Sequence, residues 1–324
     1  MQGNGSSIPL LVVSCDKYAD VWPYFFGLLN LHWPDCPFPV LLGSNQLSPE
    51  LPGVTSVLVG PDSSWSTGAR KMLDRVTELY PDAEYVLLFL EDFLLTAPAD
   101  TTRIVELVQI ARRRKIGCLR IAAGLPLALP PTYELSEFPG VGVIAPGEPY
   151  RVTLQAAVWR IETLRRLLAP GLSAWEFEQI GTPMSEGFAD VFWAVMQPAI
   201  EYDQAIEKGK WKPEGLAILR NAGLDAGTLT RDVFSEAELV SHYNRSREES
   251  AISEHRSAAL RSFLAGRRIE GLRHIWRGIR YGNPTLADLT LALVGSLGRA
   301  ATRKALSGYV GLRLRSYSRR ESNQ

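Results

Sequence analysis

The chain has 324 residues, of which 46% are apolar and 22% charged, as is usual for a soluble globular protein. Its three cysteines and four histidines lack the spacings of a disulfide framework or a zinc site, which predicts a reducing compartment. The formal net charge is zero, but residues 256–324 carry 14 Lys and Arg against 3 Asp and Glu, which predicts an acidic body and a basic tail.

The first predicted strand covers residues 8–14, a short apolar run rich in Val and Leu. The polar segment 14–18 separates this strand from a helical pattern that begins at Tyr24. Polar residues between a first strand and its helix are where α/β folds hold nucleotides. Asp16 is therefore a candidate ligand of a base or ribose, and Tyr18 is a candidate for stacking on a base. The alternative for Asp16 is an ordinary helix N-cap.

The next predicted elements are two strands and a helix, at residues 37–43, 54–59 and 71–80. Ser66 or Thr67 can cap this helix, and Arg70 lies close to its start. A helix N-terminus with these residues is a candidate anion site, in which Ser66 and Arg70 contact a phosphate. The alternative is an ordinary capped helix with a solvated Arg70. The chain contains neither GxGxxG nor GxxxxGK[ST], which argues against a dinucleotide fingerprint or a P-loop.

The strongest signal is the stretch 85–96, in which an apolar run ends in Glu91 and Asp92 before a second apolar run. A continuous apolar run of this length predicts a strand that is buried on both faces of a parallel sheet. Open α/β sheets bind ligands beyond the carboxyl ends of their strands, where the two carboxylates should lie. This pattern indicates a divalent metal and phosphate site. The alternative is that the two acids cap a helix or pair with a surface Arg.

A helix follows from about residue 101 to 114, with Asp100 or Thr101 as its N-cap. Residues 124–149 are rich in Pro and Gly, which predicts a long irregular loop or a short hairpin. Loops of this length commonly cover a site. Residues 150–160 are strand-like.

A basic segment, Lys208-Gly-Lys-Trp-Lys-Pro213, lies further along the chain. It suits a flexible phosphate clamp in which Lys208 and Lys210 supply charge, Gly209 is the hinge, and Trp211 stacks on the ligand or closes the site. The alternative is a solvated basic turn, because lysines in turns are usually exposed.

The composition changes again at His255, where arginines begin to alternate with apolar residues at helical spacing. This pattern predicts a body at residues 1–254 and a basic amphipathic helical tail at residues 255–324 that binds an anionic membrane surface. Packing against a partner subunit is an alternative, whereas no motif of nucleic-acid recognition is present. We expect no signal peptide and no membrane span, so the protein is predicted to be cytoplasmic or peripheral on the inner face of the plasma membrane.

The order of these elements resembles that of GT-A glycosyltransferases over roughly residues 8–215. The matching features are a first strand with a polar turn, a central strand ending in paired acids, a later acidic helix start and the Lys/Gly/Trp segment. Leu90-Glu91-Asp92 stands where the family has its DXD motif, with only the last acid in register, and is similar to the variant in bacterial lipooligosaccharide glycosyltransferases. The resemblance implies an α/β, Rossmann-like fold with a mostly parallel central sheet flanked by helices, followed by a C-terminal helical extension.

The same resemblance implies a hexosyltransferase that uses a nucleotide-sugar donor and a saccharide or lipid-linked acceptor in bacterial cell-surface polysaccharide synthesis. Asp92 would bind a divalent metal, Mg²⁺ or Mn²⁺, that bridges the donor diphosphate, and Glu91 would contact the metal shell or the sugar. Asp16 would lie beside the nucleoside.

An inverting member also needs a carboxylate base for the acceptor hydroxyl. Trp175-Glu-Phe-Glu178 resembles the place where such enzymes carry it, so Glu176 and Glu178 are the candidates and Trp175 would pack on a sugar face. Ser173 and Glu176 also fit a capping box, which is the structural alternative for Glu176. A retaining outcome stays open, as do a nucleotidyltransferase and a non-catalytic, membrane-associated assembly protein.

Overall fold

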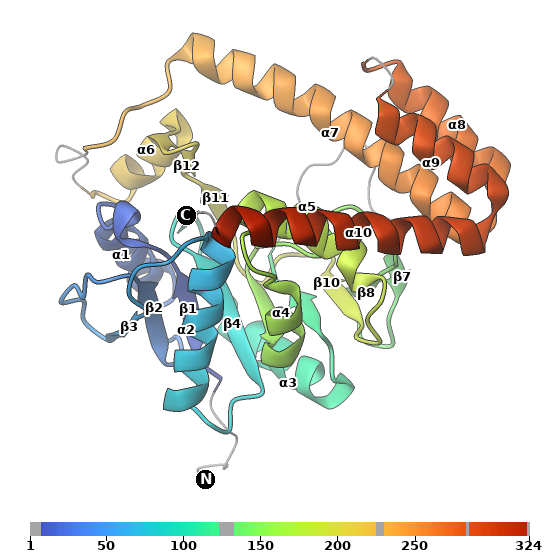
Figure 1. Cartoon of the computed structure of the whole chain (residues 1–324). Coiled ribbons are helices and arrows are strands. Elements are labelled where there is room, and N and C mark those ends of the chain that lie inside the picture. The colour runs from blue at the N-terminus through green and yellow to red at the C-terminus, as the bar shows by residue number, and fades with distance from the viewer. Residues whose placement is uncertain (1–7, 123–132, 225–229, 283–284, 323–324) are drawn as a thin grey trace.

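The computed structural model describes residues 8–122, 133–224, 230–282 and 285–322. Within these ranges the protein is a mixed α/β fold, with a large central sheet flanked by helices and a C-terminal helical extension, as predicted. Figure 1 shows the sheet and its helices in the lower part of the molecule, α7 along the top, α8 and α9 at the right, and α10 running back across the middle. No helix among the described residues is both long enough and apolar enough to cross a bilayer.

The central sheet has nine strands in the order β3-β2-β1-β4-β9-β6-β10-β8-β7. Seven of these strands run in one direction, and only β9 and β8 run against them. The sheet strands are β1 (Leu10–Val13), β2 (Val40–Ser44), β3 (Val54–Leu58), β4 (Tyr85–Leu90), β6 (Cys118–Arg120), β7 (Tyr133–Leu135), β8 (Val141–Ile144), β9 (Ala157–Arg160) and β10 (Phe192–Val195). Two small antiparallel ribbons pair β5 (Phe93–Leu95) with β11 (Tyr202–Gln204), and β12 (Ile206–Glu207) with β13 (Lys210–Trp211).

Helices cover both faces of this sheet. The side chains of α1, α3 and α6 pack on one face, and those of α2, α4 and α5 pack on the other. The helices of the body are η1 (Asp16–Tyr18), α1 (Trp22–His32), α2 (Trp65–Leu79), α3 (Thr101–Arg114), α4 (Ile161–Leu167), α5 (Ala174–Ser185) and α6 (Pro213–Asn221). The C-terminal helices are α7 (Glu236–Leu264), α8 (Arg268–Ile279), α9 (Leu286–Leu297) and α10 (Arg299–Ser322).

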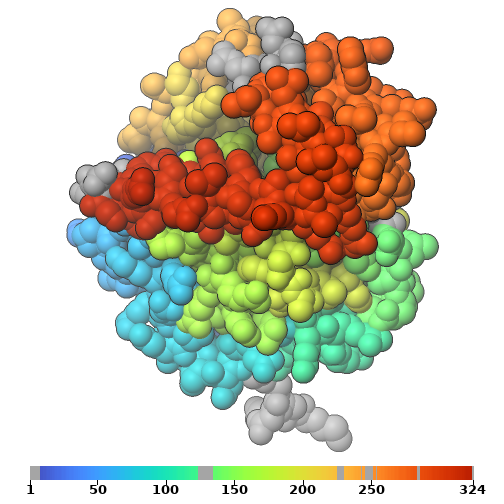
Figure 2. Space-filling view, turned by 45° about the vertical axis from the view of Figure 1, so that its right-hand side comes forward, coloured from blue at the N-terminus to red at the C-terminus, as the bar shows by residue number. Residues whose placement is uncertain are grey.

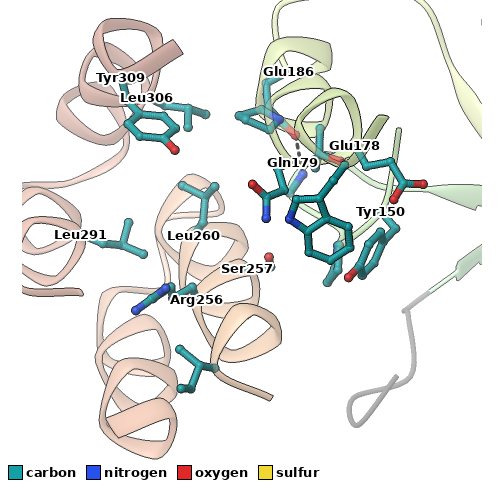
Figure 3. Close-up of a pocket in the computed structure, with 16 residues that line it drawn as sticks. Tyr150, Glu178, Gln179, Glu186, Arg256, Ser257, Leu260, Leu291, Leu306 and Tyr309 are labelled. Atoms are coloured by element: carbon teal, nitrogen blue, oxygen red, sulfur yellow. Dashed lines mark hydrogen bonds between the residues drawn. The ribbon is translucent and has the colours of Figure 1, made fainter. Parts of the chain in front are cut away.

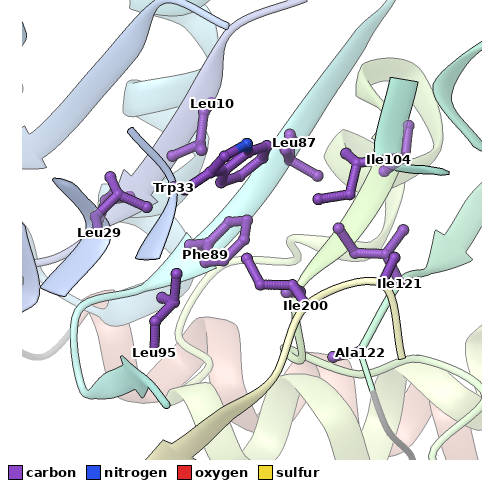
Figure 4. Packing of buried hydrophobic residues seen from close by; sticks show 14 of the residues in the cluster. Leu10, Leu29, Trp33, Leu87, Phe89, Leu95, Ile104, Ile121, Ala122 and Ile200 are labelled. Carbon is purple, nitrogen blue, oxygen red and sulfur yellow. The ribbon is translucent and has the colours of Figure 1, made fainter. Parts of the chain in front are cut away.

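Strand β4 lies at the centre of the core, as its apolar run predicts. Leu87 and Phe89 belong to the cluster on one face, and Val86 and Leu88 belong to the cluster on the other. Figure 4 shows Leu87 and Phe89 among the packed side chains of the first cluster. Because β4 pairs in parallel with β1, the chain leaves β4 at the carboxyl edge of the parallel strands, which is where the paired acids were expected.

Several local predictions need correction or refinement. Helix α2 is capped by Ser64, whose hydroxyl accepts a hydrogen bond from the backbone N–H of Thr67, so the predicted cap at Ser66 or Thr67 was wrong. The strand-like run 150–160 pairs only over its last four residues, as β9. Of the Pro- and Gly-rich segment 124–149, the described part contains the β7–β8 hairpin, and residues 123–132 lie outside the described residues.

The predicted tail does not extend away from the body, because α10 returns to it. Tyr317 is only 2% exposed and belongs to the apolar cluster that α2 and α5 form. The carboxylate of Glu321 accepts a hydrogen bond from the hydroxyl of Ser64, the residue that caps α2. Figure 2 shows α10, in red, lying across the cyan and yellow-green parts of the body. Helix α7 runs through residues 254 and 255, where the sequence predicted a boundary.

Candidate functional site

A cavity of about 900 Å³ opens at the carboxyl end of β4. Its walls come from the β4–β5 turn, the β5–β11 ribbon, the β12–β13 turn, the start of α5 and the segment before β9. Five of the residues predicted for the site line this cavity, namely Tyr18, Asp92, Trp175, Glu178 and Lys208. These five residues are spread over 190 positions of the sequence, and the fold brings them together around one cavity.

Glu91 lies behind the cavity wall and is only 6% exposed. The hydroxyl of Ser14, at the end of β1, hydrogen-bonds its carboxyl group and also accepts a hydrogen bond from the indole N–H of Trp22 at 2.7 Å. Burial, together with the neighbouring Asp92, raises the pKa of Glu91 well above its usual value. The first strand and the central strand therefore hold this acid between them.

Asp92 lines the cavity itself and is partly buried. The side-chain amide of Gln204 donates a hydrogen bond to its Oδ2 atom at 3.3 Å. Burial raises the pKa of Asp92 to about 6, and the hydrogen bond from Gln204 opposes this shift. Within the described residues, neither Asp92 nor Glu91 forms a salt bridge, so the alternative of a surface pair with an Arg is not what the structure shows.

The donor set at this turn is compatible with a hard divalent cation. Among the described residues no three His, Cys, Asp or Glu side chains gather closely enough to enclose a metal ion. Mg²⁺ and related ions are often held by only one or two carboxylates, with substrate phosphates and water completing the shell. Two neighbouring acids with raised pKa values, one of them facing a large cavity, provide such a partial shell.

Glu178 stands on α5 and lines the same cavity as Asp92. Its Oε1 atom accepts hydrogen bonds from the backbone N–H of Leu154 at 2.7 Å and from the hydroxyl of Thr153 at 3.0 Å. Burial raises the pKa of Glu178, and these two hydrogen bonds oppose the shift. The acid is thus fixed in position with a proton affinity above that of an ordinary glutamate, as a general base requires.

Glu176, two residues earlier, has a structural role in this arrangement. Its carboxylate accepts a hydrogen bond from the backbone N–H of Ser173 at 2.9 Å and forms a salt bridge with Arg320 of α10 at 2.8 Å. The capping box predicted for Ser173 and Glu176 is confirmed. Glu176 is not among the residues that line the cavity, whereas Trp175, which is 57% exposed, is.

Asp16 was expected beside a nucleoside, but in the structure it organises a neighbouring loop. Its carboxylate accepts hydrogen bonds from the backbone N–H groups of Asn45, Gln46 and Leu47, just after β2. It is not an N-cap either, because Cys15 stands at the N-cap position of η1. Asp16 therefore ties η1, which carries Tyr18, to the end of β2.

The other predicted donor contacts lie away from the cavity. Ser66 is buried and accepts a hydrogen bond from the backbone N–H of Leu172, and the exposed Arg70 donates to the carbonyl of Arg165. Lys210 forms a salt bridge with Glu238 at 2.8 Å, and Trp211 is entirely buried in the core. Trp211 is thus a core residue in this structure and does not close the site, because β12 and β13 fold its side chain inward.

Sequence reasoning missed several residues that build the cavity. Tyr202 stacks on Phe93 with 4.6 Å between ring centroids, and its hydroxyl accepts a hydrogen bond from the backbone N–H of Ala156. Gln204 and Lys212 also line the cavity. These residues join the site because β11 pairs with β5 from more than a hundred positions away, and short ribbons of this kind leave no periodic signal in the sequence.

Arg231 is a further residue that the sequence did not reveal. Its guanidinium lies over the ring of Tyr18, 4.2 Å from the centroid, and forms a salt bridge with Asp20 at 2.8 Å. Burial and the nearby Asp92 and Glu91 raise the pKa of Tyr18 to about 12. Arg231 thus fixes Tyr18 at the mouth of the cavity and adds a positive charge near the two acids.

Comparison with known proteins gives a limited result. No protein-family model matches the chain, and no curated protein matches it. Among solved structures, TarS 1-349 from S. aureus aligns with 93% of this chain and 90% of its own, with a TM-score of 0.44 and 12% sequence identity. Similarity at this level does not transfer residue roles or chemistry.

Proposed function

We propose that this protein is a glycosyltransferase that moves a hexosyl group from a nucleotide-sugar donor to a saccharide or lipid-linked acceptor in bacterial cell-surface glycan synthesis. The observation that carries the proposal is Asp92 at the carboxyl end of β4, with Glu91 buried beside it, facing a cavity of about 900 Å³ in which Glu178 supplies a second acid. The strand order and the mostly parallel sheet are consistent with a GT-A-like fold.

In this proposal the donor diphosphate lies at the β4–β5 turn. Asp92 would hold a divalent ion, Mg²⁺ or Mn²⁺, which would supply charge neutralisation of the leaving diphosphate. Lys208 and Lys212 line the same cavity and would add positive charge near the phosphates. Tyr18, braced by Arg231, would stack on the base.

Glu178 is the base in this proposal, in preference to Glu176. It would take the proton of an acceptor hydroxyl while that oxygen bonds to the anomeric carbon and the bond from carbon to the diphosphate oxygen breaks. An inverting outcome follows, because attack and departure occur on opposite faces of the sugar. Trp175, exposed at the start of the same helix, would pack on a sugar face.

The C-terminal helices would hold the enzyme on the inner face of the plasma membrane. Helix α8 exposes Ile269, Leu272 and Trp276, and the neighbouring α9 exposes Leu286, Leu289, Leu293 and Leu297, seven side chains that we call the apolar patch. Arg273, Arg277 and Arg280 of α8 are also exposed. An apolar face flanked by arginines is what a helix needs to lie in the surface of an anionic bilayer.

The proposal can be tested by measuring the unfolding temperature of the purified protein with UDP-, GDP-, dTDP- and CMP-sugars, with and without Mn²⁺. A donor that binds only the native state raises the unfolding temperature, by more as its concentration rises above its Kd. We expect one nucleotide class to stabilise the protein in an Mn²⁺-dependent manner, and the Asp92→Asn variant to lose this dependence. Stabilisation by none of the nucleotide-sugars would contradict the proposal. Stabilisation by nucleoside triphosphates instead would favour a nucleotidyltransferase.

A further inference from the structure

A second cavity, of about 570 Å³, lies between α5 and the C-terminal helices. Figure 3 shows its two sides: Gln179 and Glu186 lie on the side of the body, and side chains of α7, α9 and α10 face them from across the gap. Tyr150 and Glu178 line the cavity at its edge, with the carboxyl group of Glu178 directed away from the C-terminal helices. The C-terminal helices are therefore one wall of a space that reaches the candidate site.

The two cavities share part of their lining. Tyr150, Trp175 and Glu178 line both the cavity at the end of β4 and the cavity beside the C-terminal helices. The proposed base therefore stands where the two spaces meet. A molecule that fills the second cavity can present one end to Glu178 without entering the space assigned to the donor.

Tyr150, at this junction, has an unusual backbone conformation. Its φ angle is +52°, in the left-handed region that favours glycine, and the other non-glycine residues with positive φ among those described are Lys115, which ends α3, and Lys208. Lys208 lines the first cavity. A tyrosine in this conformation costs about 1–3 kcal/mol, and such residues persist mainly at functional sites. The fold thus holds Tyr150, with its aromatic ring at the junction of the two cavities, in a backbone conformation that tyrosine disfavours.

The chemistry of the lining selects the kind of occupant. Trp175 and Tyr309 are both more than half exposed and offer aromatic faces. Within the described residues, the side chains of Gln179, Ser257 and Tyr309 make no hydrogen bond, so they retain donors and acceptors for a ligand. Aromatic faces beside unused hydrogen-bonding groups suit a polyhydroxylated ligand.

An acyl chain fits this lining less well. Glu178 and Glu186 both line the space. Each already accepts hydrogen bonds from the protein through one carboxyl oxygen, and a hydrocarbon placed against the other oxygen would remove water from it without providing a hydrogen bond. Leu260, Leu291 and Leu306 form an apolar floor on the side of the helices. A saccharide has both apolar C–H faces and hydroxyl groups, and so matches both halves of the lining.

We propose that this second cavity is the acceptor subsite, and that it binds the saccharide chain whose terminal hydroxyl reaches Glu178. This inference rests on the proposed function and adds to it, because it makes the C-terminal helices part of the acceptor site as well as the route to the membrane. Ser257 on α7 and Tyr309 on α10 are then specificity-determining residues that stand far from the donor in the sequence.

The probe for this subsite is a printed array of bacterial capsular, lipooligosaccharide and other cell-wall glycans. We expect the full chain to bind at least one class of glycan. Ser257→Trp, which fills the cavity, should weaken that binding by at least about tenfold, and Tyr309→Ala should weaken it about fivefold through loss of one aromatic contact. The matched control is Leu312→Ala, also an exposed residue of α10 but outside the cavity lining, which should bind as the wild type does.

Three outcomes separate the possibilities. Unfolding temperatures within a few degrees of wild type establish that the variants fold, and Tyr309→Ala, at an exposed position, remains informative if Ser257→Trp does not fold. Glycan binding that is absent from the whole array, or that neither variant weakens, overturns the subsite. Binding of the fluorescent fatty acid cis-parinaric acid that Ser257→Trp abolishes also overturns it, in favour of an acyl chain. If nucleotide-sugars stabilise the wild type, the proposed function survives any of these failures of the subsite.

Discussion

The α/β body and the C-terminal helices differ in how far they bury their apolar side chains. The body buries its large apolar residues in two clusters on either side of the sheet. Helices α7–α9 share only a small cluster around Phe263 and Ile275, and nearly half of the large exposed apolar side chains among the described residues lie beyond residue 264. The body thus buries most of its large apolar side chains, with Tyr317 of α10 completing one cluster, whereas α8 and α9 leave a large apolar surface exposed.

This contrast indicates that the two regions have different roles. The groups suited to donor chemistry are held inside the body by strand ends and short ribbons, and the groups suited to attachment are displayed on α8 and α9. The first and third predictions below change one region and ask whether the other is unaffected, and the second and fourth concern the acids of the body.

The largest effect is expected from Asp92→Asn in the body. The substitution preserves the size and the hydrogen bond from Gln204 but removes the charge, so sugar transfer or donor hydrolysis should fall on the order of 10³-fold. Vesicle binding should be unchanged. The matched control is Asp82→Asn, an exposed acid just before β4, and turnover should be retained in that variant. Full activity in Asp92→Asn would contradict the assignment of the donor site.

Glu178→Gln should lower turnover on the order of 10²-fold, because the base is lost while the hydrogen bonds to Oε1 can still form. Glu176→Ala, two residues away, should instead lower the free energy of unfolding by about 1 kcal/mol, because it removes half of the capping box and the contact with Arg320. Turnover from initial rates and unfolding by urea distinguish the two. The opposite pattern would exchange the roles of the two glutamates.

The third prediction changes the helical region alone. The double variant Trp276→Asp with Leu293→Asp should bind vesicles of phosphatidylcholine and phosphatidylglycerol at least about 30-fold more weakly, since the two side chains, partly buried at the lipid surface, would together contribute about 2 kcal/mol. The control is Leu47→Asp, an exposed apolar position on the body. Cosedimentation measures the binding, and activity on soluble acceptors should persist. If the variant instead changes the oligomeric state seen by light scattering, the apolar patch binds a second copy.

The smallest effect is a dependence of stability on pH. Because the pKa of Asp92 is raised to about 6 in the folded protein, the folded state binds more protons than the unfolded state between about pH 4 and 6. Stability of the metal-free protein should therefore fall as pH rises through this window, and Glu91 and Glu178, whose pKa values are also raised, should add to the fall. Urea unfolding across this range should show a shallower fall in Asp92→Asn. Added Mn²⁺ should restore stability above pH 6.

The sequence predicted those parts of the site that depend on contiguous residues. The buried strand and the exit of Glu91 and Asp92 at the sheet edge follow from one apolar run, and the capping box at Ser173 follows from a four-residue pattern. The inward turn of Trp211 was not predictable, because a two-residue strand carries no period that distinguishes its faces.

Contacts between distant segments were also beyond the reach of the sequence. The place of Arg231 over Tyr18 depends on a separation of more than two hundred residues, and the pairing of β11 with β5 has no local pattern. The basic composition of the last helices predicted an amphipathic tail at a membrane surface and did not indicate that Tyr317 packs on an apolar site that α2 and α5 form in the folded body. The amino-acid composition indicated which kinds of side chain these helices expose, but not that α10 packs on the body.

Helix α10 joins α9 at one end and is fastened to α2 and α5 at the other, and its 24 residues span about 36 Å. If the apolar patch on α8 and α9 binds lipid, a rod of fixed length between those helices and the body would set the height of Glu178 above the bilayer. The enzyme would react with an anchored glycan only once that glycan is long enough to cover this height. The helix would then act as a ruler, and the shortest acceptor that is elongated would report its length.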